Sequence, residues 1–340
     1  VLRGGVYRSL GQSAKANENF IAATRITPRD AAGYKGRGDA YDELDQPERA
    51  LEDFTESIRL GNRDSSVYVS RANPYYYRLR RSARAIEDYD TAIRLSPSDS
   101  LVYTNRGTSY AALGRLDRAL EDNTAALRLN PSDGVAYANR GRAYSSLAKY
   151  ARAIEDFDEA IRLNPKHVSG YHARGWAYYK LDQHAKALAD YDAAIRVNPS
   201  NEDGYAQRGR MHKRMGDFDR AIADYNEAIR LYPNFASAYC ARGSAFAWSG
   251  KPERAKEDFE AAIRMKPKDP WMYSAYAWTL ATNPDDRFRN GKKAVEMATK
   301  ACEITEWKDA NDLENLGCSY AESGDFASAE MAARALATRE

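Results

Sequence analysis

Proline recurs at a fixed spacing along most of the chain. Successive members of one series lie 34 residues apart, and Pro28 lies two periods plus one residue before the first of them: Pro97, Pro131, Pro165, Pro199, Pro233 and Pro267. A period of this length is typical of a solenoid, in which one supersecondary unit stacks on copies of itself. The two or three compact domains that 340 residues would otherwise suggest are therefore not expected.

Each period carries two apolar stripes with helical spacing. If the recurring glycine is numbered position 8, the first stripe falls at positions 4, 8 and 11, as in Tyr137, Gly141 and Tyr144. The second stripe occupies positions 20, 24, 27 and 28, and one unit fills it with Ala153, Phe157, Ala160 and Ile161. We expect two antiparallel helices, A and B, in which the small residues at 8 and 20 permit close approach and the ring at 24 fills the adjacent space.

This pattern, with proline at position 32, resembles the tetratricopeptide repeat (TPR) family over essentially the whole chain. The resemblance implies an all-α fold, a right-handed α-solenoid of tandem antiparallel helix pairs that forms a TPR superhelix. We expect a single solenoid over residues 1–340. Its expected parts are a partial repeat at 1–30, seven full repeats of about 34 residues at 31–269, a stretched repeat with an inserted loop at 270–309 and a terminal repeat at 310–340.

Three segments depart from the pattern. Pro74 falls inside a helix A that also carries one extra residue, so that helix should kink or break, either as a neutral variation or as a hinge or docking notch with three exposed tyrosines, Tyr75, Tyr76 and Tyr77. Asn123 stands where other units have an aromatic ring, which predicts a softer contact between repeats. Residues 282–291 lengthen the link between two helices and should project as a loop, to which we assign no function.

Composition argues against several classes of protein. The chain has 51 Lys and Arg against 49 Asp and Glu, a net charge of +2, which does not favour an electrostatic nucleic-acid binder. Three cysteines are too few for a disulfide framework, and we see neither a signal peptide nor a membrane span, so we expect a cytoplasmic protein with no membrane partner. Because Val1 is not an initiator methionine, the chain is also compatible with a fragment whose targeting signals were removed.

No arrangement of residues indicates catalysis. The four histidines lack the i, i+4 spacing of a metal pair, and neither a Cys-x-x-Cys motif nor a phosphate-binding glycine loop occurs. Cys240 and His172 lie two units apart with no third group to orient them. We therefore expect no enzyme, no catalytic residues, no metal and no cofactor.

Most charges have a structural explanation. Arginine at position 7 recurs with aspartate at position 23, as in Arg37 with Asp53, so these side chains are expected to pair. Four acid-first i, i+4 pairs are also expected on helices B: Asp90 with Arg94, Asp158 with Arg162, Asp192 with Arg196 and Glu260 with Arg264.

The remaining face of helix A, positions 2, 5, 6, 9, 12 and 13, lines the concave groove in the family that the chain resembles. Amides recur at position 6, basic residues gather in the middle units, and tryptophans accompany them, whereas the first full unit is acidic. The expected groove for a peptide or partner comprises Asn105, Thr108, Asn139, Arg142, His172, Trp176, Tyr179, Lys180, Gln207, Arg210, Lys213, Arg214 and Trp248. Amides suit an extended backbone, basic groups suit acids, and tryptophan suits stacking.

The first interpretation of function is a non-catalytic interaction scaffold that binds a protein or peptide with an acidic and aromatic segment. The second is a regulatory or targeting arm cut from a larger, possibly enzymatic, protein, and the third is an RNA-binding solenoid. The partial first repeat is also compatible with end-to-end self-association. The resemblance raises one further possibility, a clamp for the acidic tails of heat-shock chaperones, but Asp39, Ser70 and Leu101 stand where that clamp needs other residues, so we expect none.

Overall fold

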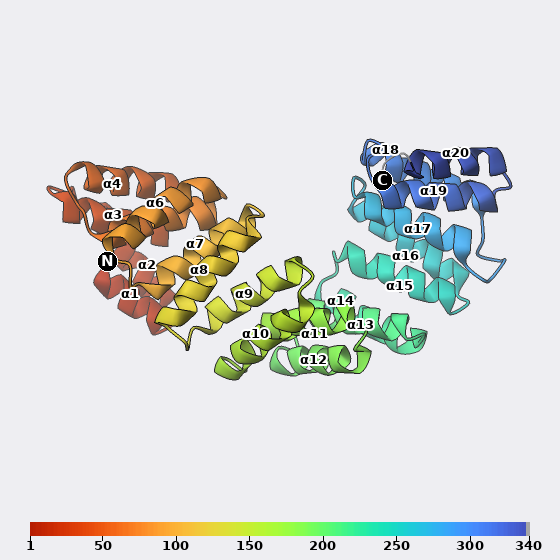
Figure 1. Ribbon diagram of the computed structural model, residues 1–340, viewed down its shortest axis with the longest axis horizontal. Coiled ribbons are helices and arrows are strands. Elements are labelled where there is room, and N and C mark those ends of the chain that lie inside the picture. Colours follow the sequence, from red (N-terminus) through yellow and green to blue (C-terminus); the bar gives the residue numbers. More distant parts are fainter. Residues whose placement is uncertain (338–340) are drawn as a thin grey trace. The chain divides into compact units, whose positions relative to one another are not determined.

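The structure is a computed structural model that describes residues 1–337, and within them all regular secondary structure is helical (Figure 1). It divides into two compact units, Val1–Leu181 and Asp182–Glu340. The first unit contains α1 (Leu2–Ser9), α2 (Ser13–Thr24), α3 (Ala31–Glu43), α4 (Pro47–Arg59), α5 (Ser65–Asn73), a π-helix (Pro74–Arg78), α6 (Ser82–Leu95), α7 (Ser100–Ala112), α8 (Leu116–Leu129), α9 (Gly134–Ser146), α10 (Tyr150–Leu163) and α11 (Val168–Lys180). The second contains α12 (His184–Val197), α13 (Glu202–Arg214), α14 (Phe218–Leu231), α15 (Ala236–Trp248), α16 (Pro252–Met265), α17 (Pro270–Thr282), α18 (Gly291–Ile304), α19 (Ala310–Glu322) and α20 (Phe326–Ala337).

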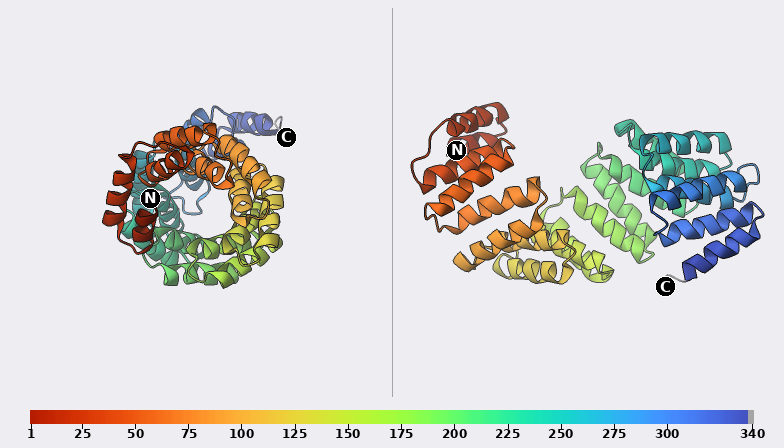
Figure 2. Two further views of the ribbon diagram at one scale, coloured as in Figure 1. Left: turned by 90° about the vertical axis from the view of Figure 1, so that its left-hand side faces the viewer. Right: turned by 90° about the horizontal axis from the view of Figure 1, so that it is seen from above.

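Within each unit consecutive helices run antiparallel and lie side by side (Figure 2). The glycine at position 8 makes this packing possible, because a Cβ atom placed on Gly38 would lie 2.7 Å from the ring of Phe54, and one on Gly141 would lie 2.8 Å from the ring of Phe157. Helix A usually begins at an aspartate or asparagine cap. The Asp133 side chain, for example, accepts hydrogen bonds from the backbone N–H groups of Val135 and Ala136. The all-α solenoid that the period predicts is confirmed.

The arginines at position 7 connect consecutive repeats. Arg106 binds Asp122 of its own repeat at 2.6 Å, as predicted, and also binds Asp90 of the preceding repeat at 2.6 Å. The same double arrangement recurs at Arg208, which binds Asp224 and Asp192.

The predicted i, i+4 pairing of Asp90, Asp158 and Asp192 is therefore wrong. These carboxylates bind Arg106, Arg174 and Arg208 of the next helix A at 2.6 to 2.7 Å. The arginine at position 7 lies beside the buried stripe and is less hydrated than an exposed arginine on helix B. It therefore gains more from pairing with a carboxylate. The exposed Arg162, which was assigned to Asp158, instead pairs with Glu159 at 2.8 Å.

The Pro74 segment breaks its helix as predicted, in a specific way. α5 ends at Asn73, and the extra residue is taken up by the π-helix Pro74–Arg78, in which Leu79 N–H donates to the carbonyl of Pro74 over 3.0 Å. The alternative of a docking notch with three exposed tyrosines is wrong for two of them. Tyr75 and Tyr76 pack against the apolar core, and only Tyr77 is exposed.

Residues 283–290 link α17 to α18 and do not simply project as a loop. Phe288 is buried in the core of the second unit, and Asn290 N–H donates to the carbonyl of Leu280 over 3.1 Å. Asn290 also caps α18 by accepting a hydrogen bond from Lys293 N–H. The insert is anchored because its aromatic residue gains more from burial than from exposure.

The apolar core differs between the units. In the second unit one continuous cluster extends from Ala221 to Leu316, whereas the first unit contains smaller separate clusters. One of these ends at Val102 and the next begins at Ala126, with Asn123 buried in the interval. A polar side chain occupies the place where other repeats have an aromatic ring, so the apolar contact is interrupted there.

Candidate functional site

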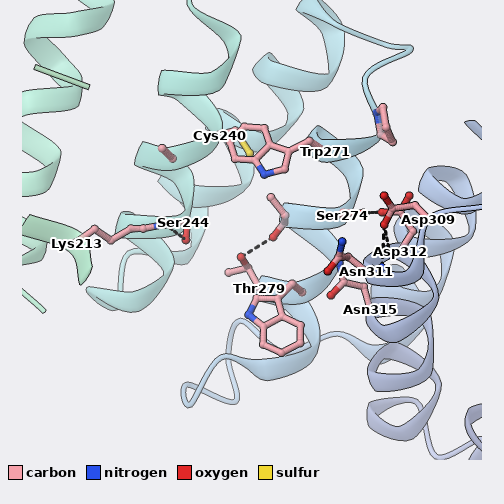
Figure 3. Close-up of a pocket in the computed structure, with 14 residues that line it drawn as sticks. Lys213, Cys240, Ser244, Trp271, Ser274, Thr279, Asp309, Asn311, Asp312 and Asn315 are labelled. Carbon is pink, nitrogen blue, oxygen red and sulfur yellow. Dashed lines mark hydrogen bonds between the residues drawn. The ribbon is translucent and has the colours of Figure 1, made fainter. Parts of the chain in front are cut away.

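In the second unit the A helices line two adjoining cavities. One, of about 400 Å³, lies between α13 and α15, and the other, of about 490 Å³, lies among α15, α17 and α19 (Figure 3). Lys213, Ala241 and Trp271 line both, so the two form a continuous depression that we call the α13–α19 trough. Most of its lining comes from positions 2, 5, 6, 9 and 12 of helix A. Of the predicted groove residues, Gln207, Arg210 and Lys213 lie in it.

Lys213 lies where the two cavities meet. Its Nζ donates to Ser244 Oγ over 3.3 Å, a neutral partner (Figure 3). Burial lowers the pKa of Lys213, and repulsion from Arg210 lowers it further. The positive charge is thus held in partly desolvated surroundings, where it attracts an anion more strongly than a fully exposed lysine does.

The acidic residues at the far end of the trough are occupied by structural bonds. Asp309 caps α19 by accepting hydrogen bonds from the N–H groups of Asn311 and Asp312. The Asp312 carboxylate accepts hydrogen bonds from the hydroxyls of Ser274 and Thr305. The amides of Asn311 and Asn315 line the same cavity. This end therefore offers amides rather than available carboxylates.

Two tryptophans of the trough were not among the predicted groove residues. Trp271 and Trp278 lie seven residues apart on α17, on one face of that helix, and are 46% and 41% exposed. They occupy positions 2 and 9 of the stretched repeat, which belong to the predicted groove face, so the repeat register alone could have identified them. Exposed tryptophans that line a cavity are typical of interaction surfaces.

In the first unit the predicted groove residues form hydrogen bonds across consecutive A helices. Asn139 Nδ2 donates to Thr108 Oγ1 over 3.0 Å, and Arg142 donates to Asn139 Oδ1 over 2.9 Å. Arg142 also reaches Ser169 Oγ at 3.4 Å, and the Tyr77 hydroxyl donates to Asn105 Oδ1 over 3.5 Å. α7, α9 and α11 are linked on this face by neutral acceptors.

The other predicted residues of the first unit lie on α11. The rings of Trp176 and Tyr179 have their centroids 5.1 Å apart, and Lys180 Nζ lies 5.0 Å from the centroid of Trp176. Trp176 and His172 are half-buried, so Trp176 is less exposed than we expected. In the second unit Arg214 and Trp248 end α13 and α15 and lie outside the linings of the two trough cavities.

Neither a metal site nor a membrane span is found in the part of the chain that the structure describes. No group of three or more His, Cys, Asp or Glu side chains in residues 1–337 is placed to hold a metal ion. None of the helices in that range is long and apolar enough to cross a bilayer. Cys240 lines the trough but is 1% exposed, and burial raises the pKa of its thiol to about 12, so it is not activated as a nucleophile.

Comparison with known proteins agrees with the helix-pair architecture. Models described as tetratricopeptide repeat match residues 74–134, 134–167, 168–201 and 236–269, and a model described as TPR repeat matches 209–250. A search of curated proteins gives no match.

Two solved structures, described first below, show the same fold. A tetratricopeptide repeat protein from Parabacteroides merdae matches with a TM-score of 0.62 and 21% identity, over 75% of this chain and 98% of that one. The Cut9–Hcn1 hetero-tetramer of the APC/C matches with a TM-score of 0.60 and 12% identity, over 91% of this chain and 59% of that one. YrrB, described as a TPR protein with an unusual peptide-binding site, is 25% identical over 56% of this chain and 98% of its own, with a TM-score of 0.46.

The packing and the register define an all-α helical-repeat protein, and in its second unit the A helices line the trough. The chain belongs to the tetratricopeptide repeat family as a tandem repeat protein.

Proposed function

We propose that this protein is a non-catalytic scaffold that holds an extended peptide or a partner helix against its A helices. The observation that carries the proposal is the α13–α19 trough, which runs across four successive A helices and combines a partly desolvated lysine on α13, two exposed tryptophans on α17 and two amides on α19. Helix axes about 8–10 Å apart give a path of about 30 Å across four helices, which about nine extended residues would follow.

The preferred ligand in this proposal carries an acidic and an aromatic residue. Lys213 and Arg210 would attract the acid, and Trp271 and Trp278 would stack with the aromatic ring. Arg142, which bonds only to neutral acceptors among the contacts described above, would extend the same preference to the first unit.

The test is selection from a displayed library of random 12-residue peptides on the whole immobilised chain, followed by calorimetry with the selected peptides. Replacing both Trp271 and Trp278 with alanine should weaken binding at least tenfold, with helicity unchanged. The matched control is Arg230→Glu on α14, an exposed site that pairs with Glu227 at 2.6 Å and should leave binding intact. A failure to enrich any peptide, or binding that responds to Arg230 and not to the tryptophans, would refute the trough as the docking surface.

The charge preference is tested separately. The triple variant Arg142→Glu, Arg210→Glu, Arg214→Glu should lose acidic peptides but retain its circular dichroism, and Trp176→Ala tests the first unit alone.

We place the protein in the cytoplasm. The role of regulatory arm within a larger polypeptide uses the same surface, and the sequence flanking residues 1–340 distinguishes it from a free-standing scaffold.

We also propose that a second copy of the chain can cover α1. Leu2 and Val6 of α1 and Leu10, the residue that caps its end, are exposed at one-turn intervals, with Leu2 90% exposed. Such a stripe favours self-association at high concentration. Light scattering of Val6→Asp, Leu10→Asp should show a lower mean mass than the unmodified chain does, and a monomer in both cases would contradict this proposal.

A further inference from the structure

Tyr225 has a hydroxyl group that its own fold does not use. It occupies position 24 of helix B, where Phe54, Phe157 and Phe259 stand in other repeats. A Cβ atom placed on Gly209 would lie 3.0 Å from a ring carbon of Tyr225, so the ring passes directly beside helix A. Tyr225 is 1% exposed, and its hydroxyl oxygen has no hydrogen-bond partner in residues 1–337.

Tyr89 shows how this position is normally satisfied when it carries a hydroxyl. That tyrosine is also fully buried, and its hydroxyl donates to Asn73 Oδ1 over 2.8 Å. Burying a hydroxyl without a partner costs free energy that phenylalanine would not cost. The Tyr225 hydroxyl is therefore available to hydrogen-bond with a group from outside the chain.

The surroundings of Tyr225 indicate what that contact is. Tyr225 lines the cavity of about 400 Å³ between α13 and α15 together with Gln207, Arg210 and Lys213. Arg210 and Lys213 lie one turn apart on the same face of α13. Within residues 1–337 neither has a carboxylate within 4 Å, whereas the arginines at position 7 described above each have one or two.

Asp203 also lines this cavity and must be counted. It lies seven residues before Arg210, which is about 10 Å along the helix axis, and ten residues before Lys213. With Asp203 included, the net charge of the cavity is +1. Asp203 is too far along the helix to pair directly with Arg210 and Lys213. A single carboxylate, with two oxygens that accept up to four hydrogen bonds, matches this charge and these donors.

We propose that this cavity is a subsite for the carboxylate of an aspartate or glutamate side chain in a bound peptide. Arg210 and Lys213 neutralise it, the Tyr225 hydroxyl and the Gln207 amide donate to it, and the neighbouring peptide residue lies on Trp271, which borders the same cavity. This inference rests on the peptide-binding function proposed above. It adds Tyr225, a helix-B residue, to a surface otherwise formed by A helices.

The experiment uses the best acidic peptide from the 12-residue library and two synthetic counterparts, one with glutamine or asparagine and one with phosphoserine at the acidic position. Calorimetry is run at one salt concentration on the whole chain and on Tyr225→Phe, Lys213→Met and Tyr89→Phe. Tyr225→Phe should weaken the acidic peptide about tenfold, since a hydrogen bond to a charged group is removed. The amide peptide should bind the unmodified chain about tenfold or more weakly and should not distinguish Tyr225→Phe from it.

Thermal unfolding of the same variants separates binding from folding. Tyr225→Phe should melt at or above the temperature of the unmodified chain, because it removes an unpaired hydroxyl, while Tyr89→Phe should melt lower and bind unchanged. The subsite would be overturned, and the scaffold function would stand, if Tyr225→Phe bound the acidic peptide as tightly as the unmodified chain does. The same holds if the unmodified chain bound the amide peptide as tightly as the acidic one. Tighter binding of the phosphoserine peptide would overturn the carboxylate assignment. If the library yields no peptide, the scaffold function fails and the subsite fails with it.

Discussion

At Asn123 the packing of one repeat differs from that of the others. It is fully buried at position 24, its Nδ2 donates to the carbonyl of Ala119 over 2.7 Å, and its Oδ1 has no partner among the described residues. The facing glycine is retained, since a Cβ atom on Gly107 would lie 2.8 Å from Asn123 Nδ2. The space that accepts a ring in the other repeats is thus filled by a polar group that is only half satisfied.

Asn123→Phe should therefore raise the free energy of unfolding by about 1–3 kcal/mol, because it removes a buried unpaired acceptor and restores an apolar contact. The matched control is Phe157→Asn in the next repeat, which should cost about 3 kcal/mol or more. Urea unfolding followed by circular dichroism measures both. A loss of stability in Asn123→Phe would mean that this site has closed around the amide and no longer accepts a ring.

Asp42 predicts a pH dependence at the acidic end of the A helices. Burial, the largest effect, raises the pKa of its carboxyl, nearby Asp39 and Asp45 raise it further, and Arg78 opposes the rise. Because the folded chain holds the proton more tightly than the unfolded chain, this group costs stability as pH rises from its unfolded pKa of about 4 through the raised folded value. Asp42→Asn should be more stable than the unmodified chain at pH 7, and the difference should shrink towards pH 4.

The control for Asp42 is Asp45→Asn. Asp45 is an exposed neighbour that pairs with Arg78 at 3.3 Å, and its loss should change stability by less than about 1 kcal/mol at either pH. Thermal unfolding at pH 7 and pH 4 separates the two variants. An Asp42→Asn difference that stays constant with pH would show that packing rather than ionisation distinguishes the two side chains.

The sequence predicts the core residues and the ion pairs within one repeat better than it predicts contacts between repeats. The pairing of Arg106 with Asp122 follows from two positions of one period, whereas its bond to Asp90 depends on how the next repeat packs. Likewise the positions of Gln207, Arg210 and Lys213 in the repeat were enough to predict them as groove residues. The role that we give to Tyr225 depends instead on how its ring packs beside helix A and reaches the cavity. That its hydroxyl lacks a partner follows only from the three-dimensional packing.

At the scale of elements, the π-helix is a weak point in the first unit. Pro74 contributes no N–H, and the segment replaces i→i+4 bonds with the wider bond from Leu79 N–H to the carbonyl of Pro74. The proline and the extra residue predicted an interruption of the helix. They did not predict its form, because packing of Tyr75 and Tyr76 against the core decides where the extra residue is accommodated.

Amide hydrogen exchange should be faster around residues 74–80 and around Asn123 than in α10. The physical reason is that fewer regular backbone bonds and a weaker apolar contact lower the cost of local opening, whereas Phe157 of α10 is a fully buried aromatic ring. Exchange followed by mass spectrometry on the whole chain measures this. Equal protection across the three segments would show that opening is cooperative over the entire first unit.

At the scale of the whole molecule, the apolar core suggests that the two units differ in stability. The second unit has one continuous apolar cluster, and the first has clusters that are interrupted near Asn123. In a helical-repeat protein, stability is approximately a sum of repeats and nearest-neighbour contacts, so a weak contact divides the chain into parts that unfold at different denaturant concentrations. We propose that the repeats, although they follow one another continuously in the sequence, do not unfold in one step.

The tryptophans make this testable, because Trp248, Trp271, Trp278 and Trp307 belong to the second unit and only Trp176 to the first. In Trp176→Phe, fluorescence reports the second unit alone, while circular dichroism reports both. The dichroism signal should begin to fall at lower urea than the fluorescence does, since the first unit opens earlier. Adding Asn123→Phe should move only the early part of the dichroism curve and leave the fluorescence midpoint unchanged. Superimposable curves for the two probes, or an equal shift of both by Asn123→Phe, would mean that the repeats are coupled strongly enough to unfold as a single cooperative body.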